Sequence, residues 1–124
     1  MSTQVVDAGW PPAGDVFNSG CPTRAVLDHV TSKWAVLVLA ALEAGPMRFS
    51  ALRRRIDGVS EKMLAQTLRT LEADGFLERE VAPTTPPQVT YRLSSLGADL
   101  TVHMSALLGF INTRIPDIQA ARRS

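Results

Sequence analysis

Three polar side chains near the middle of the chain have the types and the spacing needed to read DNA bases. Lys62, Gln66 and Arg69 recur at i, i+4 and i+7, so a helix would present them on one face. In a major groove, lysine and arginine suit guanine, and glutamine suits adenine. Many solvated helix faces look similar, so this pattern predicts DNA binding only together with its surroundings.

The charge around these residues supports that interpretation. Residues 48–69 contain six basic and two acidic residues, a local balance of +4 on a chain with a formal net charge of only +1. A basic patch of this kind attracts phosphates. The residues predicted to contact DNA, from this stretch and from the strand that follows it, are Arg48, Ser50, Arg53, Arg54, Ser60, Lys62, Met63, Gln66, Thr67, Arg69, Gln88 and Arg92.

Catalytic chemistry has few candidates. Cys21, His29 and His103 are the obvious nucleophile and bases, but no motif or third orienting group accompanies them. No ligand pair has a recognised metal spacing either. We therefore expect no enzymatic activity, no metal site and no cofactor.

Cys21 is the only cysteine, which excludes a disulfide within the chain. It precedes Pro22 at the expected start of a helix, where the helix dipole and Arg24 would lower its pKa. Reversible oxidation would then give a sulfenic acid, a mixed disulfide, or a bridge to Cys21 of the partner subunit. Cysteine is also a common small core residue, so a sensor role and a packing role both remain open.

The helix that carries Lys62 is well bounded in the sequence. Ser60 is a good N-cap, Val59 can pack on Leu64, and Gly75 supplies the left-handed stop. Upstream, the pattern predicts a helix from Cys21 or Thr23 to about residue 30, and a second capped by Ser32 with Trp34 in the core. Ser50 is expected to cap a short third helix ending at Ile56. Two short helices joined by the Asp57-Gly58 turn indicate a helix-turn-helix.

After Gly75 the period changes from helical to alternating. Residues 77–81 and 89–93 predict a β-hairpin, and Ser94 can cap a long helix that Pro116 is expected to stop. The apolar stripe of this helix is broader than one small core needs, which indicates a dimer. The residues predicted at the dimer interface are Trp10, Phe17, Leu100, Met104, Leu107, Leu108 and Ile111.

Length and composition predict one domain. The 124 residues are 45% hydrophobic and 20% charged, with no apolar run of the roughly 18 residues that cross a membrane. Without a signal-peptide pattern, the expected location is the cytoplasm, away from membranes. We expect an irregular arm at residues 1–20 and a mainly α, winged helix-turn-helix domain (α+β) at 21–124, with a dimerisation helix at 94–115.

Several short motifs occur together in the order typical of one family. They are Cys21-Pro22, Lys33-Trp34, Arg48-Phe49-Ser50-x-Leu52, Ser60-x-Lys62-x-Leu64, Leu71-Glu72-x-Asp74-Gly75, Pro86-Pro87-x-Val89-x-Tyr91-x-Leu93 and Leu96-Gly97. From residue 21 to about 111 the chain resembles the HxlR family of bacterial transcriptional regulators, a MarR-like winged-helix group. The resemblance implies a homodimer on a palindromic operator in double-stranded DNA, with the long terminal helix and the N-terminal region in the dimer interface. It also implies that helix 60–74 enters the major groove and that the hairpin acts as the wing. The expected regulator is a repressor.

Some members of that family sense oxidants, electrophiles or aldehydes through a cysteine matching Cys21, and others respond to ligands, so a small electrophile or ligand is a candidate effector here. Two departures stand out. Thr31-Ser32 replaces the usual glycines, and the wing tip, residues 83–88, has no basic residue to grip phosphate. The main alternative is a dimeric protein-interaction module without sequence-specific DNA binding.

Overall fold

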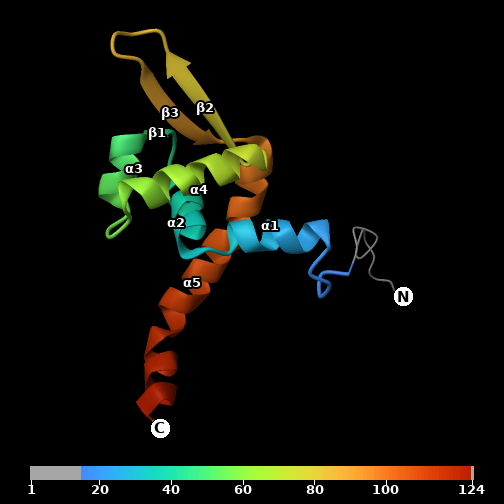
Figure 1. Ribbon diagram of the computed structural model, residues 1–124. Helices are drawn as coiled ribbons and strands as arrows, with labels where there is room; N and C mark the ends of the chain where they lie inside the picture. Colours follow the sequence, from blue (N-terminus) through green and yellow to red (C-terminus); the bar gives the residue numbers. More distant parts are fainter. Residues whose placement is uncertain (1–14, 124) are drawn as a thin grey trace.

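The computed structural model describes residues 15–123, which form five helices and three strands (Figure 1). Trp10 lies outside the described residues. The mainly α winged-helix architecture predicted from the sequence is confirmed. In chain order the elements are α1 (Pro22–Val30), α2 (Lys33–Leu42), β1 (Met47–Arg48), α3 (Phe49–Arg55), α4 (Glu61–Ala73), β2 (Leu77–Ala82), β3 (Gln88–Leu93) and α5 (Ser95–Arg123).

The core forms around α2, whose sequence is almost entirely apolar. Helices α3, α4 and α5 and strand β3 all pack against it. The large apolar side chains with almost no exposed surface are Val38, Leu39, Leu52, Leu64, Leu68 and Leu71. Trp34 packs against the edge of this core, as its position in the apolar stripe predicts. The leucines of α3 and α4 therefore fix the helix-turn-helix to the body of the domain.

Local signals set both ends of α4. The Ser60 hydroxyl oxygen accepts a hydrogen bond from the backbone N–H of Met63 at 3.0 Å, so Ser60 is the predicted N-cap. At the other end Asp74 is the C-cap and Gly75 has φ +84, a conformation that side chains other than glycine rarely adopt. The expected boundaries of this helix are confirmed.

The sheet has one more strand than the predicted hairpin. Its antiparallel order is β1-β3-β2, and β1 pairs Met47 with Tyr91 and Arg48 with Thr90. Pairing keeps the backbone extended through Arg48, and α3 begins at the next residue. Arg48, rather than Ser50, is therefore the N-cap of α3, and the predicted cap was wrong by two residues.

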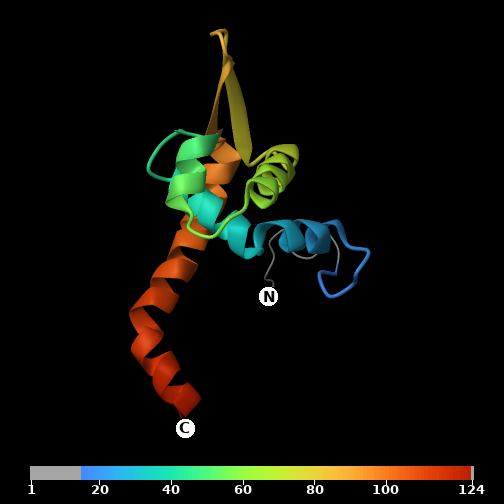
Figure 2. The same ribbon diagram turned by 60° about the vertical axis from the view of Figure 1, so that its left-hand side comes forward.

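The last helix is longer than expected. The Ser94 hydroxyl accepts from the N–H of Gly97 at 3.0 Å and donates to the carbonyl of Gly75, which confirms its predicted capping role. Pro116, expected to stop the helix near residue 115, lies inside α5, which continues to Arg123. Proline removes one helical hydrogen bond, but no glycine follows it, and Arg114 bridges to Asp117 at 2.7 Å. The lower half of α5 extends well away from the body (Figure 2).

No single helix within residues 15–123 is long and apolar enough to cross a membrane. Helices α1 and α2 reach that length and hydropathy only together, as a pair bent by 71°.

Candidate nucleic-acid interface

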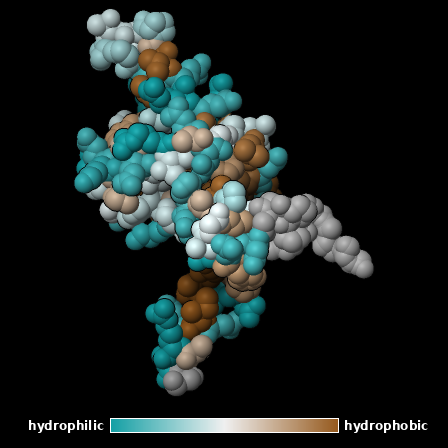
Figure 3. Space-filling view, turned by 45° about the vertical axis from the view of Figure 1, so that its right-hand side comes forward, coloured by the Kyte–Doolittle hydropathy of each residue, from teal (hydrophilic) through white to brown (hydrophobic). Residues whose placement is uncertain are grey.

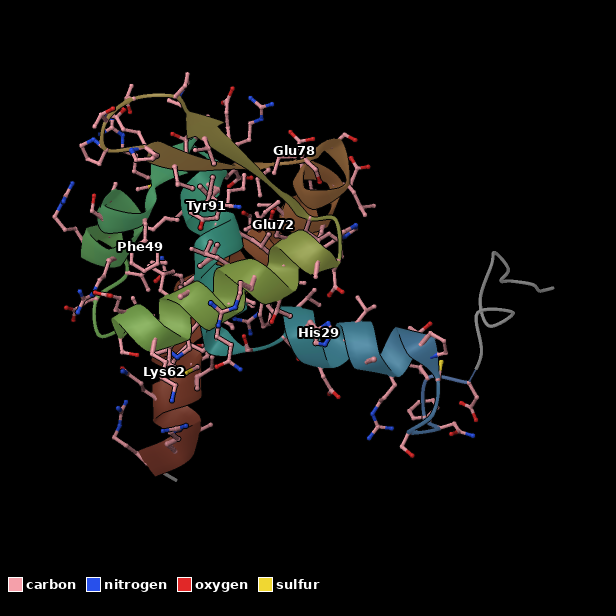
Figure 4. The ribbon with its side chains drawn as sticks, turned by 45° about the horizontal axis from the view of Figure 1, so that its top comes forward. His29, Phe49, Lys62, Glu72, Glu78 and Tyr91 are labelled. Carbon is pink, nitrogen blue, oxygen red and sulfur yellow. The ribbon has the colours of Figure 1, made fainter. Side chains whose placement is uncertain are left out.

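Helix α4 has one buried face and one exposed face. Leu64, Leu68 and Leu71 point into the core, while Lys62, Gln66 and Arg69 are exposed. Figure 4 shows Lys62 at the N-terminal end of the helix, with its side chain directed away from the body. Three side chains suited to base edges therefore share the open face of a rigidly held helix.

Thr67, predicted as a DNA contact, does not belong to this face. Its side chain is buried, and its hydroxyl donates to the carbonyl of Met63 at 2.8 Å. Helix α1 contacts α4, and its Asp28 and His29 line a cavity together with Thr67. Met63, one turn earlier, is partly exposed beside the predicted base-reading residues.

Basic side chains of α3 flank the reading face. Arg53 pairs with Glu61 at 3.2 Å, but both side chains are at least half exposed, so the pair adds little stability. Arg54, Lys62 and Arg69 have no carboxylate within 4.0 Å among the described residues. Ser50 and Ser60 are exposed in the same region. The positive potential predicted for residues 48–69 is therefore largely unneutralised.

Two residues predicted to contact DNA, Arg48 and Gln88, are hydrogen-bonded to each other. The Nη2 atom of Arg48 donates to Oε1 of Gln88 at 2.7 Å, although the residues are 40 positions apart. Arg48 precedes α3, and Gln88 begins β3. This bond connects the start of the helix-turn-helix to the wing, and places both side chains on the same exposed edge.

Arg92, the other wing residue predicted to bind DNA, is neutralised within the wing. Its Nε lies 2.9 Å from Oε1 of Glu78 and its Nη1 lies 3.6 Å from Oε1 of Glu80. The hydrogen bond and charge of Glu78, followed by the charge of Glu80, raise the pKa of Arg92. Arg79 similarly lies 3.8 Å from Glu72. The pairing of Arg92 with Glu78 and Glu80 was not predicted. The sequence does carry a signal for it, because Glu78 and Glu80 alternate with Arg79 and so lie on one face of the strand.

Cys21 occupies the N-cap position of α1, as predicted. The residue is 7% exposed. Partial burial raises the pKa of the Cys21 thiol, but the backbone N–H of Arg24 and the hydroxyl and backbone of Thr23 outweigh this and lower it overall. The site thus favours the thiolate while limiting access to it.

The predicted dimer residues divide into two groups. Leu100 and Met104 pack against the core of their own chain, so self-packing accounts for part of the stripe. Leu107 and Ile111 are exposed on α5, and Leu108 is half-buried. Phe17, which precedes α1, is also exposed. Figure 3 shows hydrophobic atoms along the part of α5 that leaves the body. Further exposed apolar side chains lie on α5 and α1, namely Phe110, Ile115, Ile118, Val26 and Leu27.

The two histidines have separate surroundings. His29 bonds to Asp74, whereas His103 is exposed on α5. Within residues 15–123, no three His, Cys, Asp or Glu side chains come together as a metal site would require.

Comparison with known proteins gives concordant matches. Residues 29–119 match the HxlR-like helix-turn-helix family. Over 109 residues the chain is 51% identical to YtfH of Escherichia coli K12, an HTH-type transcriptional regulator, covering 88% of this chain and 86% of YtfH. Its fold is similar to that of the transcriptional regulator YtfH from Salmonella typhimurium, with a TM-score of 0.85 and 50% identity. The match covers 90% of this chain and 99% of that structure. It is also similar to the redox regulator HypR in its reduced form, with a TM-score of 0.74 and 29% identity. That match covers 80% of this chain and 98% of the HypR structure.

Proposed function

This chain belongs to the HxlR-like helix-turn-helix family of transcriptional regulators, and we propose that it acts as a homodimer on palindromic promoter DNA. Helix α4 of each subunit enters a major groove, where Lys62, Gln66 and Arg69 read bases. The exposed face of α4 carries this proposal, because the buried leucines opposite fix the helix with Lys62, Gln66 and Arg69 facing outward. A dimer lying across a promoter excludes other proteins from the same DNA, so we expect repression, in the cytoplasm.

Phosphate contacts come from the residues around α4. Arg53 and Arg54 of α3 lie close to the N-terminus of α4, where N–H groups also favour anions, and Arg48 lies at the start of α3 beside the wing. These contacts position the protein on the duplex without reading sequence. The wing contributes through Gln88 and its backbone rather than through net charge, because carboxylates neutralise Arg92 and Arg79.

The homodimer is supported by apolar surface that the described chain leaves open. Leu107, Phe110 and Ile111 are exposed on the projecting part of α5. On α1, Pro22, Val26 and Leu27 line an apolar hollow of about 450 Å³. A second copy of the chain would cover both surfaces and set two α4 helices roughly 34–36 Å apart, one turn of DNA.

We further propose that Cys21 makes DNA binding sensitive to oxidants or electrophiles. Its lowered pKa favours the reactive thiolate, and the similar protein HypR is a redox regulator. Cys21 begins α1, so an adduct there would disturb the proposed interface and change the spacing of the two α4 helices. Another small-molecule effector remains the alternative trigger.

The decisive experiment measures DNA binding by fluorescence anisotropy, using a palindromic operator selected in vitro from random sequence. Alanine at Lys62, Gln66 or Arg69 should cost about 1–3 kcal/mol and relax preference at one position of each half-site. Arg54→Ala is the matched control, because losing a phosphate contact weakens all sequences alike and reduces the salt slope by about 1. Unchanged operator preference in the triple alanine variant would refute the assignment.

The second candidate function is a dimeric protein-interaction module. It is favoured by the neutralised wing, which removes a common source of phosphate attraction. A gel shift separates the two functions, because an interaction module would select no sequence and show no preference for palindromic DNA.

A further inference from the structure

An open-sided cavity of about 200 Å³ lies on the flank of the recognition helix. Asp28 and His29 of α1 and Ser32, the N-cap of α2, form one wall. The other wall belongs to α4 and consists of Met63, Gln66, Thr67 and Thr70. Figure 4 shows His29 on α1 beside the C-terminal half of α4, where its bond to Asp74 ties the two walls together. The cavity therefore lies between α1, which is part of the proposed dimer interface, and α4, the proposed DNA-reading helix.

The cavity wall is acidic and rich in acceptors. Asp28 supplies a carboxylate, Gln66 an amide oxygen, and Ser32 and Thr70 hydroxyl oxygens. His29 is the one basic side chain of the lining, and its Nδ1 is bonded to Asp74, whereas no lysine or arginine lines the space. The neighbouring Lys33 has its Nζ 4.3 Å from the ring centroid of Trp34 instead. Met63 and the threonine methyl groups add apolar surface. This combination suits a ligand with a cationic donor head and a small apolar body, and disfavours an anion.

The volume limits the size of that ligand. About 150 Å³ is enough to hold a benzene-sized molecule. A space of about 200 Å³ therefore accommodates one ring, or an alkyl chain of similar size, with a short ammonium arm.

We propose that this cavity is an effector site for a small primary amine, whose ammonium group binds the Asp28 carboxylate. The regulatory part of this inference rests on the proposed function. Gln66 connects the two sites, because it lines the cavity and also lies on the exposed face of α4. An amine that hydrogen-bonds to the Gln66 amide oxygen withdraws that side chain from the DNA bases, and so weakens operator binding more than non-specific binding.

Benzylamine is the probe for this site, with benzyl alcohol and benzoate as neutral and anionic controls of similar shape. Titration at neutral pH, followed by amide chemical shifts, should show saturable changes at Asp28, Ser32, Gln66 and Thr70. Benzylamine should bind about threefold more tightly than either control, because a charge-assisted hydrogen bond to an exposed carboxylate is lost in both. Equal affinities for the three compounds, or shifts confined to other surfaces, would overturn the site.

Asp28→Asn tests the carboxylate. Asp28 is exposed, so the amide should leave the fold intact, and Asp99→Asn on α5 is the matched exposed control. Benzylamine affinity should fall about threefold in Asp28→Asn and stay unchanged in Asp99→Asn. If both variants bind like the wild type, the assignment of the ammonium group is wrong.

Operator binding is then measured with and without benzylamine at saturation. We expect at least about a fivefold loss of operator affinity, with less than about a twofold loss on random DNA. Benzylamine binding without this difference would refute the effector role. The proposed function is judged separately by operator binding without probe, so a chain that binds DNA but not benzylamine disproves the cavity site alone.

Discussion

The Nδ1 atom of His29 lies 2.6 Å from Oδ2 of Asp74, which joins the last turn of α1 to the residue that ends α4. A carboxylate at a helix C-terminus meets the negative end of the helix dipole, and the imidazole partner offsets that unfavourable placement. Because α1 belongs to the proposed dimer interface, this bond couples the interface to the orientation of the recognition helix.

Breaking the His29–Asp74 bond should destabilise the fold and loosen the spacing of the two half-sites. His29→Ala and Asp74→Asn should each lower the free energy of unfolding by about 1 kcal/mol, and the double variant should lose less than their sum. Urea denaturation measures the coupling. The affinity of each variant for operators with one extra base pair between the half-sites measures how tightly their spacing is held. His103→Ala, at an exposed histidine of α5, is the control. Strictly additive effects would show that the two residues are not coupled.

The paired arginine of the wing should contribute little to DNA affinity. Arg92→Ala should change the dissociation constant by less than about twofold, because Glu78 and Glu80 already neutralise the guanidinium. Replacing both glutamates by glutamine should instead strengthen binding and steepen its salt dependence, because Arg92 becomes available to phosphate. Anisotropy over a salt series measures both. A loss in Arg92→Ala as large as that in Arg54→Ala would show that Arg92 contacts DNA directly.

Two exposed apolar residues of α5 provide a matched test of the dimer. Leu107 is 48% exposed and Val102 is 63% exposed, but their spacing in the helix places them on different faces. Leu107→Glu should weaken the dimer at least about a hundredfold, because it would bury an unpaired charge. Val102→Glu should leave it intact. Sedimentation velocity at micromolar concentration distinguishes these outcomes, and a monomeric wild type would contradict the homodimer.

Cys21 should react as a thiolate at lower pH than an ordinary cysteine. Since its folded-state pKa is lowered, the fraction of thiolate rises through a lower pH range than for a free thiol. The pH midpoint of iodoacetamide alkylation should shift downward relative to glutathione, while the absolute rate stays slow because the residue is 7% exposed.

The regulatory consequence of that reactivity needs a separate comparison. Diamide should reduce the operator affinity of the wild type and leave Cys21→Ser unaffected, because the serine variant has no thiol. Equal responses in the two proteins would leave Cys21 as a packing residue.

Helix α4 was predictable because its signals are local. Ser60 caps one end, Gly75 ends the other, and leucines spaced by three or four residues define the buried face. The capping role of Ser94 and the winged-helix order of elements followed from similarly short-range patterns. Thr67 was assigned to the wrong environment although helical spacing marks it, because it lies three residues after Leu64 and four before Leu71, on the buried side of α4.

The features that escaped prediction depend on residues far apart in the chain. Strand β1 has only two residues and exists through its pairing with β3, so no local alternation marks it. Arg92 meets Glu78 because the hairpin register places them opposite each other, and Arg48 meets Gln88 through the sheet.

The sequence by itself determined the helix-turn-helix, the face of α4 and the basic stretch beside it, since helix periodicity and capping act within a few residues. Only the tertiary structure decided that the charges of this stretch stay largely open to phosphate, while Arg79 and Arg92 of the wing pair with carboxylates. It also decided that Leu100 and Met104 pack inward while Leu107 stays exposed. Ion pairing and burial depend on distances in space, which helix and strand periodicity do not specify.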